Sequence, residues 1–197
     1  DLSTNSLTVS NLPGIGSFSS LVEGFENVRG SNTADQIVGD NEVNTLIGNR
    51  GDDVIDGGGG NDVIDGGIGN DVINGGDGSD RMIGGEGNDT YTFGDGIDVI
   101  DYSTSQDSIT LVRGGTVDKG ESGTDTFTDF YERIIATSNT NDWIDGLTGG
   151  GSIASLNIDL STNSLTVSNL PGIGSFSSLV EGFENVRGSN TADQIVG

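Results

Sequence analysis

A nine-residue period in the middle of the chain restricts the folds that are open to it. Five consecutive units begin at Gly48, Gly57, Gly66, Gly75 and Gly84, without a break in register. Each unit has glycine at its first and fourth positions, aspartate at its sixth and a large apolar residue at its eighth. A period of this length, held five times, is typical of stacked repeats in a solenoid.

The two parts of each unit have different backbone requirements. The first six positions follow the pattern Gly-Gly-x-Gly-x-Asp, and glycine adopts positive φ without steric cost, so this part suits a tight loop. The last three positions place one apolar side chain between two mostly small or polar ones, which predicts a very short strand with one side chain facing inward. Loop and strand together make half a turn of a flattened coil, so one full turn requires two units.

Loops are therefore expected to stack at a spacing of eighteen residues. This spacing pairs Asp53 with Asp71, Asp71 with Asp89, and Asp62 with Asp80. Carboxylates stacked at the separation of neighbouring strands, about 4.8 Å, repel one another unless something screens them. A cation bound between the loops would offset this repulsion between the carboxylates, so the repeat predicts cation sites.

The nine-residue units resemble the RTX (repeats-in-toxin, haemolysin-type) calcium-binding nonapeptide repeat, and the best matches are residues 57–65, 66–74 and 84–92. The resemblance implies an all-β fold, namely a right-handed parallel β-roll or β-solenoid with calcium between the stacked Gly-Asp loops. It also implies the ligands, which are aspartate carboxylates and the carbonyl groups of loop glycines. The implied carboxylates are Asp35, Asp53, Asp62, Asp71, Asp80, Asp89 and Asp98, and the implied carbonyls are those of Gly58, Gly60, Gly67, Gly69, Gly76, Gly78, Gly85 and Gly87.

The register continues, less regularly, beyond the five units. Residues 30–38, 39–47 and 93–101 keep parts of the pattern, although Asn44 replaces the aspartate of the second range. Eight half-turns stacked two to a coil provide about six sites between loops. The predicted inward-facing ladder consists of Ile37, Leu46, Ile55, Ile64, Ile73, Met82, Tyr91 and Ile100.

Composition supports a hard divalent cation. The net charge is −24, and residues 30–101 carry sixteen carboxylates against two arginines. A chain this acidic and this poor in apolar residues is expected to be disordered without its ligand. Histidine and cysteine do not occur in the sequence, so the available ligands are oxygen atoms, which disfavours zinc and copper. Flexible loops rich in carbonyl groups suit calcium better than magnesium.

Several function classes are disfavoured by the same composition. Without histidine and cysteine, the commonest catalytic triads and thiol chemistry are unavailable, and the periodic aspartates already have an explanation, so we expect no enzyme. The strong negative charge argues against nucleic acid as a partner. No stretch of the sequence has the pattern of a membrane span or a targeting peptide.

A second, much longer repeat involves the two ends of the chain. Residues 159–197 repeat residues 1–39 letter for letter, at an offset of 158 residues, which predicts a tandem array. A fainter half-repeat joins a segment that begins at Ile100 and ends at Ile134 to one that begins at Ile158 and ends at Val186. The sequence divides into β-rich lead-in coils at 1–29, the calcium roll at 30–101, further lead-in coils at 102–136, an Asp-x-Ile turn with a glycine-rich linker at 137–158, and the next repeat at 159–197.

Two functions are compatible with these features. In the first, the chain is a calcium-binding structural repeat of an extracellular fibre, sheath, surface layer or adhesin stalk on a bacterial cell, and it folds and stiffens on binding calcium. Its partners would then be calcium, further copies end to end and, as a candidate, surface polysaccharide. In the second, it is the calcium-binding or secretion module of a type I-secreted enzyme or toxin whose catalytic domain lies outside these residues. The identical ends favour the first.

Overall fold

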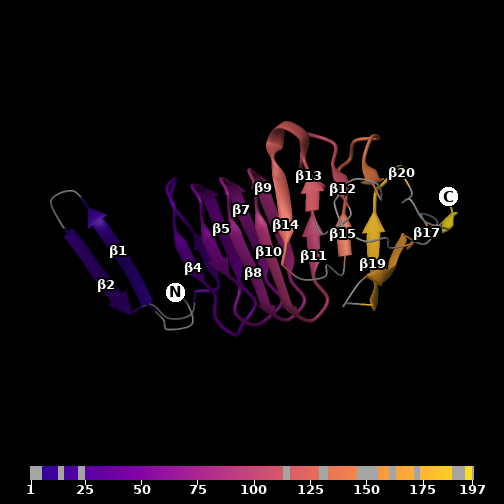
Figure 1. Cartoon of the computed structure of the whole chain (residues 1–197). Coiled ribbons are helices and arrows are strands. Elements are labelled where there is room, and N and C mark those ends of the chain that lie inside the picture. The colour runs from indigo at the N-terminus through magenta and orange to yellow at the C-terminus, as the bar shows by residue number, and fades with distance from the viewer. Residues whose placement is uncertain are drawn as a thin grey trace.

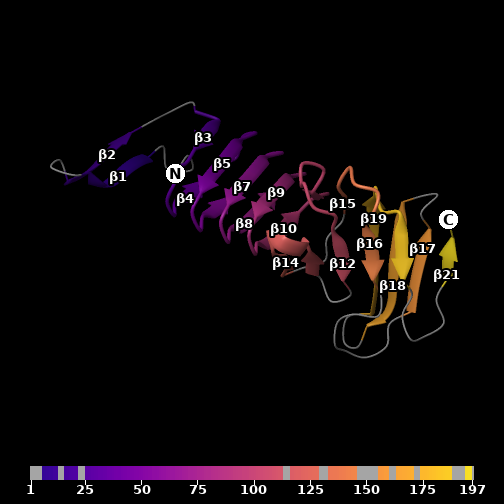
Figure 2. The ribbon, with the colours of Figure 1, turned by 90° about the horizontal axis from the view of Figure 1, so that it is seen from above.

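The computed structural model describes residues 6–12, 16–21, 25–112, 116–128, 133–145, 155–159, 163–170, 174–187 and 194–196. Within these residues the chain is all-β, apart from one turn of 3-10 helix, η1 (Gly120–Ser122). Two large sheets of nine and ten strands lie against each other, and Figures 1 and 2 show their strands stacked side by side along one axis.

The nine-residue units build the first part of this stack as a parallel β-roll. Successive strands alternate between the two sheets, and each strand pairs in parallel with the strand two places further along the chain. The ten-stranded sheet contains β3 (Asn27–Arg29), β5 (Thr45–Arg50), β7 (Val63–Ile68), β9 (Arg81–Glu86) and β11 (Val99–Asp101). The nine-stranded sheet contains β4 (Gln36–Val38), β6 (Val54–Asp56), β8 (Val72–Asp77) and β10 (Thr90–Asp95). The expected parallel roll is therefore confirmed.

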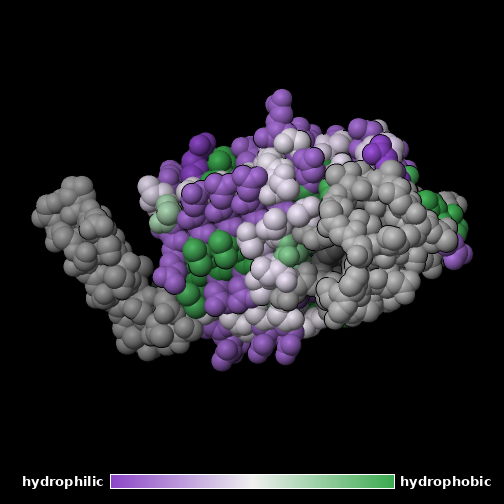
Figure 3. Space-filling model, viewed as in Figure 1, coloured by the Kyte–Doolittle hydropathy of each residue, from purple (hydrophilic) through white to green (hydrophobic). Residues whose placement is uncertain are grey.

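The core of the roll consists of two columns of eighth-position side chains, one from each sheet, packed together. Ile64 pairs with Leu46 on one side and with Met82 on the other, which is the predicted spacing of eighteen residues. All eight members of the predicted inward ladder are buried, with exposures from 0% to 4%. The seventh positions point outward, so that Val54 and Val72, paired in β6 and β8, leave an apolar patch on an otherwise mostly hydrophilic face (Figure 3).

Several strands of the roll are longer than the three residues expected from the sequence. Five of them have six residues, because pairing continues from the apolar positions into the first glycines of the next unit. Gly67, for example, pairs with Gly85, and Ile68 pairs with Glu86. The loops proper are correspondingly tighter.

Glycine is required where the loops turn. Gly69 has φ +147°, and a Cβ added there would collide with the carbonyl oxygen of Gly51 in the neighbouring coil. The same collision recurs at Gly78 with the carbonyl oxygen of Gly60. Positive φ and close stacking therefore exclude any side chain at the fourth position of a unit.

The lead-in segments are antiparallel meanders inserted into the sheets. β12 (Thr110–Val112), β13 (Thr116–Asp118) and β14 (Thr124–Phe127) are antiparallel neighbours, and β14 stacks on β10 while β12 pairs in parallel with β16 (Trp143–Asp145). In the chain, β15 (Arg133–Ile135) lies between β14 and β16, and it pairs with β11 in the ten-stranded sheet. The roll thus continues through residues 102–145, but its strands are no longer all parallel.

A second meander follows the same plan in the other sheet. β17 (Ser155–Asp159), β18 (Ser164–Leu170) and β19 (Gly174–Glu181) are antiparallel, β19 stacks on β15, and β20 (Asn185–Arg187) and β21 (Gln194–Val196) then pair with β16 and β17. The expected end of the half-repeat is confirmed, because Ile134 of β15 and Val186 of β20 occupy equivalent places. Its expected start is wrong. Ile158 of β17 corresponds to Leu111 of β12 rather than to Ile100, since Leu111 and Ile158 lie opposite Ile144 and Ile195.

The N-terminal copy of the repeated segment has fewer neighbours than the C-terminal copy. β1 (Ser6–Leu12) and β2 (Gly16–Leu21) have the same sequence as β18 and most of β19, yet they pair only with each other. The strands that flank β18 and β19 are β17 and β15, and no described strand takes their place beside β1 and β2.

Candidate metal centre

The sixth-position side chains form two ladders along the roll. In each ladder, the backbone N–H of one member donates to the Oδ1 atom of the next. Asp53 donates to Asp71 at 2.8 Å, and Asp71 donates to Asp89 at 2.9 Å. Asp62 donates in the same way to Asp80 at 2.8 Å. The three pairs expected from the eighteen-residue spacing are therefore confirmed. In the described residues the ladders comprise Asp35, Asp53, Asp71, Asp89 and Asp125 on one edge, and Asn44, Asp62, Asp80 and Asp98 on the other.

The second carboxylate oxygen of four ladder members has no donor. Oδ2 of Asp53, Asp62, Asp71 and Asp80 is buried and accepts no hydrogen bond, while each residue is only 1% exposed. A buried carboxylate that is not paired costs several kcal/mol, so native proteins pair such groups or bind a metal with them. These four oxygens therefore fit a cation.

The first glycine of each unit leaves room for such a cation. A Cβ added at Gly57 would lie 2.6 Å from Asp62 Oδ2 and would collide with the carbonyl oxygen of Gly75. At Gly75 the corresponding distances are 2.7 Å to Asp80 Oδ2 and 2.7 Å to the carbonyl oxygen of Phe93. Carboxylate and carbonyl oxygens thus converge on a space that only glycine leaves open, which suits a hard cation with oxygen ligands.

The glycines expected to supply carbonyl ligands lie in the same stack of loops. The carbonyl oxygen of Gly60 faces Gly78, and that of Gly67 faces Gly85. Among the described residues, no group of three or more carboxylates gathers at one point. A site of six to eight oxygens would therefore need these carbonyls or water in addition to the carboxylates. The assignment of individual ligands and the number of sites stay predictions.

The members at the start of each ladder differ from the interior ones. Oδ2 of Asp35 already accepts hydrogen bonds from the backbone N–H of Ser31 at 2.6 Å and from its hydroxyl at 2.9 Å. Asn44 is neutral, and its Oδ1 accepts from the backbone N–H of Asp40 at 2.8 Å. At the other end of the second ladder, Asp98 is buried and its Oδ1 accepts from Asp80. In the first loop of each ladder, the sixth-position side chain therefore accepts hydrogen bonds from its own loop.

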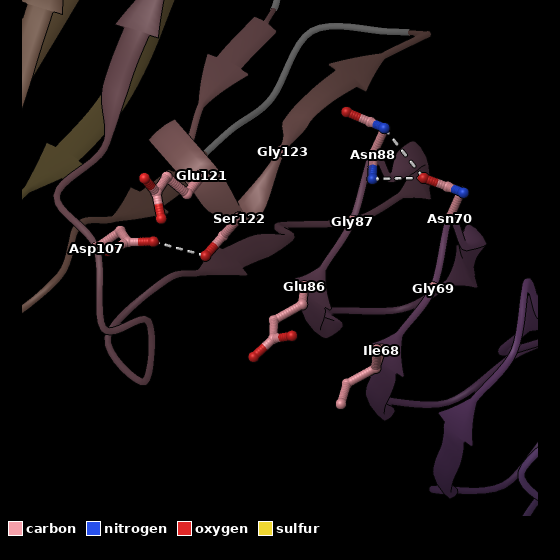
Figure 4. Close-up of a pocket in the computed structure, with 10 residues that line it drawn as sticks. All are labelled: Ile68, Gly69, Asn70, Glu86, Gly87, Asn88, Asp107, Glu121, Ser122 and Gly123. Carbon is pink, nitrogen blue, oxygen red and sulfur yellow. Dashed lines mark hydrogen bonds between the residues drawn. The ribbon is translucent and has the colours of Figure 1, made fainter.

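A further ladder, which the sequence reasoning missed, holds the outer side of the loops. Asn70 Oδ1 accepts from the backbone N–H of Asn88 at 2.9 Å, and Asn88 Oδ1 accepts from Thr124 at 2.8 Å. These asparagines lie beside an open, acidic hollow of about 510 Å³ where the roll meets η1, and Ser122 donates to Asp107 at 2.7 Å on the η1 side of it (Figure 4). The sequence feature that indicates this outer ladder is the asparagine, aspartate or serine at the fifth position of each unit.

Asp125 was also missed, although its signal is clear in retrospect. Residues 120–128 have glycine at the first and fourth positions, aspartate at the sixth and Phe127 at the eighth. The unit stacks on residues 84–92 at an offset of 36, since Tyr91 pairs with Phe127. The insertion of β12 and β13 between them hides this register in the sequence. Lys119, which contacts Asp125, gave no signal, because no other unit contains a lysine.

These features define a class of protein: a parallel β-roll whose stacked glycine-aspartate loops provide buried oxygen ligands for cations. The model of the RTX calcium-binding nonapeptide repeat (4 copies) matches residues 29–64, 38–73 and 65–100. Residues 29–100 are therefore a series of RTX calcium-binding repeats of the haemolysin type and form a calcium-binding module, and such repeats are typical of secreted bacterial proteins. No curated protein matches the chain. No helix in the described ranges has the length and apolarity needed to cross a membrane.

Burial leads to a prediction about pH. It raises the pKa of Asp71 to about 7 and that of Asp62 to about 6, because the charged form loses its hydration. A raised folded-state pKa means that protons stabilise the calcium-free roll below the unfolded value of about 4, and that this contribution is lost as the pH rises through about 6 to 7. A chain freed of calcium on a chelating resin should therefore show more β-structure by circular dichroism at about pH 5 than at about pH 8. Equal β-content at both values, or more at the higher pH, would contradict the burial of these carboxylates.

Proposed function

We propose that the chain is a calcium-stabilised structural repeat of an extracellular bacterial rod, such as a fibre, a sheath, a surface layer or an adhesin stalk, and that it performs no catalysis of its own. In this proposal successive 158-residue periods form one uninterrupted roll. Calcium, bound between the loops after export, stiffens it. The absence of histidine and cysteine from the sequence supports the non-catalytic part.

One observation carries the proposal. Two strands of identical sequence occur near each end of the chain, and neighbouring strands pair with opposite edges of the two copies. β20 and β21 are sequence copies of β3 and β4. The N-terminal copies pair with β5 and β6, which follow them, whereas the C-terminal copies pair with β16 and β17, which precede them. A copy inside an array would have both sets of neighbours, so one period can follow another without a gap.

The order of strands in the sheets supports the same continuity. One period contains the strands β3 to β19, seventeen strands that alternate between two sheets in the roll. Because this number is odd, the nine-stranded sheet ends in β20 and the ten-stranded sheet in β21, while their copies β3 and β4 begin the opposite sheets. The last strand of each sheet is therefore also the first strand of the next period, in which the two sheets exchange their places.

The axial repeat that follows from this arrangement can be measured. Seventeen strands in two columns, spaced about 4.8 Å apart, lengthen the rod by roughly 40 Å per period. Small-angle X-ray scattering of calcium-loaded chains with one, two and three periods should show the maximum dimension increasing by this amount. Periods that form separate bodies joined by linkers would give irregular increments and would overturn the proposal.

A pair of identical positions provides the matching test at residue level. Ile37 is 4% exposed, and its copy Ile195 is 49% exposed because β21 is the edge strand of its sheet in the described residues. We expect Ile37→Asp to lower the free energy of unfolding by about 3 kcal/mol or more, since it buries a charge in the core, and Ile195→Asp to cost less than about 1 kcal/mol. Urea unfolding in saturating calcium measures both.

The same Ile195→Asp substitution distinguishes an array from a single module. In a chain extended by one further period, Ile195 would lie beneath the counterpart of β6, and its substitution should become as costly as that of Ile37. If the extended chain tolerates Ile195→Asp as well as the short one does, the periods do not stack. A calcium-binding module of a secreted enzyme would then be the better account.

A further inference from the structure

The only lysine of the chain lies in the interior, at the end of one carboxylate ladder. Lys119 directly follows β13 and precedes η1, and it is 1% exposed. Lysine is seldom fully buried unless its ammonium group is paired. The atoms around the Lys119 ammonium therefore show which ligands this part of the roll offers to a cation.

The Lys119 ammonium is held by three oxygens of two stacked loops. Nζ lies 2.8 Å from the carbonyl oxygen of Gly85, 2.9 Å from Oδ2 of Asp89 and 2.6 Å from Oδ1 of Asp125. An ammonium group has three N–H donors, so each donor has one partner. Asp89 and Asp125 are themselves 1% and 0% exposed, and Oδ2 of Asp125 accepts a hydrogen bond from the Tyr102 hydroxyl at 2.8 Å.

The same atoms recur, without the lysine, in the other loops. Asp89 is the sixth residue of its unit and Gly85 is the second, and Asp125 is the sixth residue of the unit stacked upon it. In the units of Asp62 and Asp71, the corresponding Oδ2 atoms are buried without a donor. The ammonium thus lies where the equivalent loops leave an oxygen for a cation.

A calcium ion and this ammonium cannot share the site. Calcium contacts its oxygen ligands at about 2.3–2.6 Å, so an ion bound to Asp89 Oδ2 and the Gly85 carbonyl would overlap the position of Nζ. The two cations would also repel each other in a place without solvent. Calcium could enter only if the lysine left.

We propose that the loops 84–89 and 120–125 form a cation site whose resident cation is the Lys119 ammonium. The native chain therefore takes no calcium at this position, and removal of the lysine side chain turns it into a site for a divalent cation with oxygen ligands. Lys119 ends the ladder with a positive charge carried by the chain, so part of the carboxylate charge at this end of the roll is balanced whatever the calcium concentration. The proposal rests on calcium binding by the other loop pairs, which the proposed function also assumes.

Calcium counting tests the proposal directly. The 197-residue chain and its Lys119→Ala variant are brought to saturating calcium by equilibrium dialysis, bound calcium is measured by atomic emission, and circular dichroism establishes that each is folded. We expect the variant to bind one calcium ion more than the native chain. A folded variant that binds the same number, or fewer, would overturn the proposal.

A second substitution decides the matter if Lys119→Ala does not fold. Asp125→Asn removes a partner of Lys119 without touching the loops with unpaired carboxylates, so its calcium count should equal that of the native chain. Asp80→Asn is the matched control and should lose at least one ion. Loss of an ion in Asp125→Asn would show that calcium normally binds there and would refute the inference. A native chain that binds no calcium would overturn both this inference and the proposed function, whereas normal binding with an unchanged count in Lys119→Ala overturns only this inference.

Discussion

Excess EGTA at neutral pH is expected to abolish the β-sheet circular dichroism of the calcium-loaded chain, and renewed calcium should restore it. Without calcium, Oδ2 atoms of Asp53, Asp62, Asp71 and Asp80 remain buried without partners. Each such carboxylate costs on the order of several kcal/mol, and the total exceeds the 5–15 kcal/mol or so by which a domain is usually stable. We therefore expect removal of calcium to unfold the roll, rather than only to lower the midpoint of its unfolding transition.

Magnesium provides the control for this experiment. It carries the same charge but requires a small, nearly regular octahedron of ligands and gives up its water reluctantly. Magnesium added in the presence of EGTA, which leaves it largely free, should not restore the spectrum. A β-sheet signal that survives EGTA unchanged would mean that the loops need no cation.

Replacement of a fourth-position glycine should have the next largest effect. In Gly69→Ala, the new Cβ would collide with the carbonyl oxygen of Gly51, lie 2.5 Å from the carbonyl carbon of Gly51 and occupy a backbone with φ +147°. Neither the loop nor its neighbour can move without breaking the stack on both sides. We expect the free energy of unfolding in saturating calcium to fall by about 3 kcal/mol or more, as measured by urea denaturation.

Gly120→Ala separates the steric effect from the conformational one. Gly120 also has positive φ, +64°, but no other atom lies within 4 Å of an added Cβ. Its substitution should cost only about 1 kcal/mol, which is the penalty for the backbone conformation. If Gly69→Ala is no more harmful than Gly120→Ala, the coils are stacked less tightly than described.

The regular part of the fold could be predicted because each property there repeats. The apolar eighth position predicted the two columns of buried side chains between Ile37 and Ile100, and the eighteen-residue spacing predicted the carboxylate pairs, since both follow from one period. Strand length was underestimated because the glycines at the first positions lack side chains, and their pairing leaves no hydrophobic pattern to detect.

The meanders could not be predicted in the same way. β12 and β13 interrupt the period and pair with strands up to 33 residues away, such as Ile144 of β16 opposite Leu111. Their antiparallel order depends on tertiary pairing rather than on local pattern. The interruption also concealed the unit that contains Asp125. The partner of Lys119 could therefore not be identified from the sequence, although Asp125 is in the expected place within its own nine residues.

Identical sequences in different places show the limit of local reasoning most clearly. Ile37 and Ile195 have the same neighbours along the chain as far as the repeat extends, yet one is buried and the other is half-exposed. The difference is caused by the coil that stacks on β4 and has no counterpart on β21. Burial in a solenoid is thus a property of the stack, and only the arrangement of coils reveals it.

Anomalous X-ray scattering from a crystal of the calcium-loaded chain tests the central claim most directly, because it locates the ions themselves. We expect peaks about 2.3–2.6 Å from Oδ2 of Asp53, Asp62, Asp71 and Asp80, between loops eighteen residues apart, and no peak beside Lys119. Ordered loops without peaks, or carboxylates turned outward into solvent, would contradict the account.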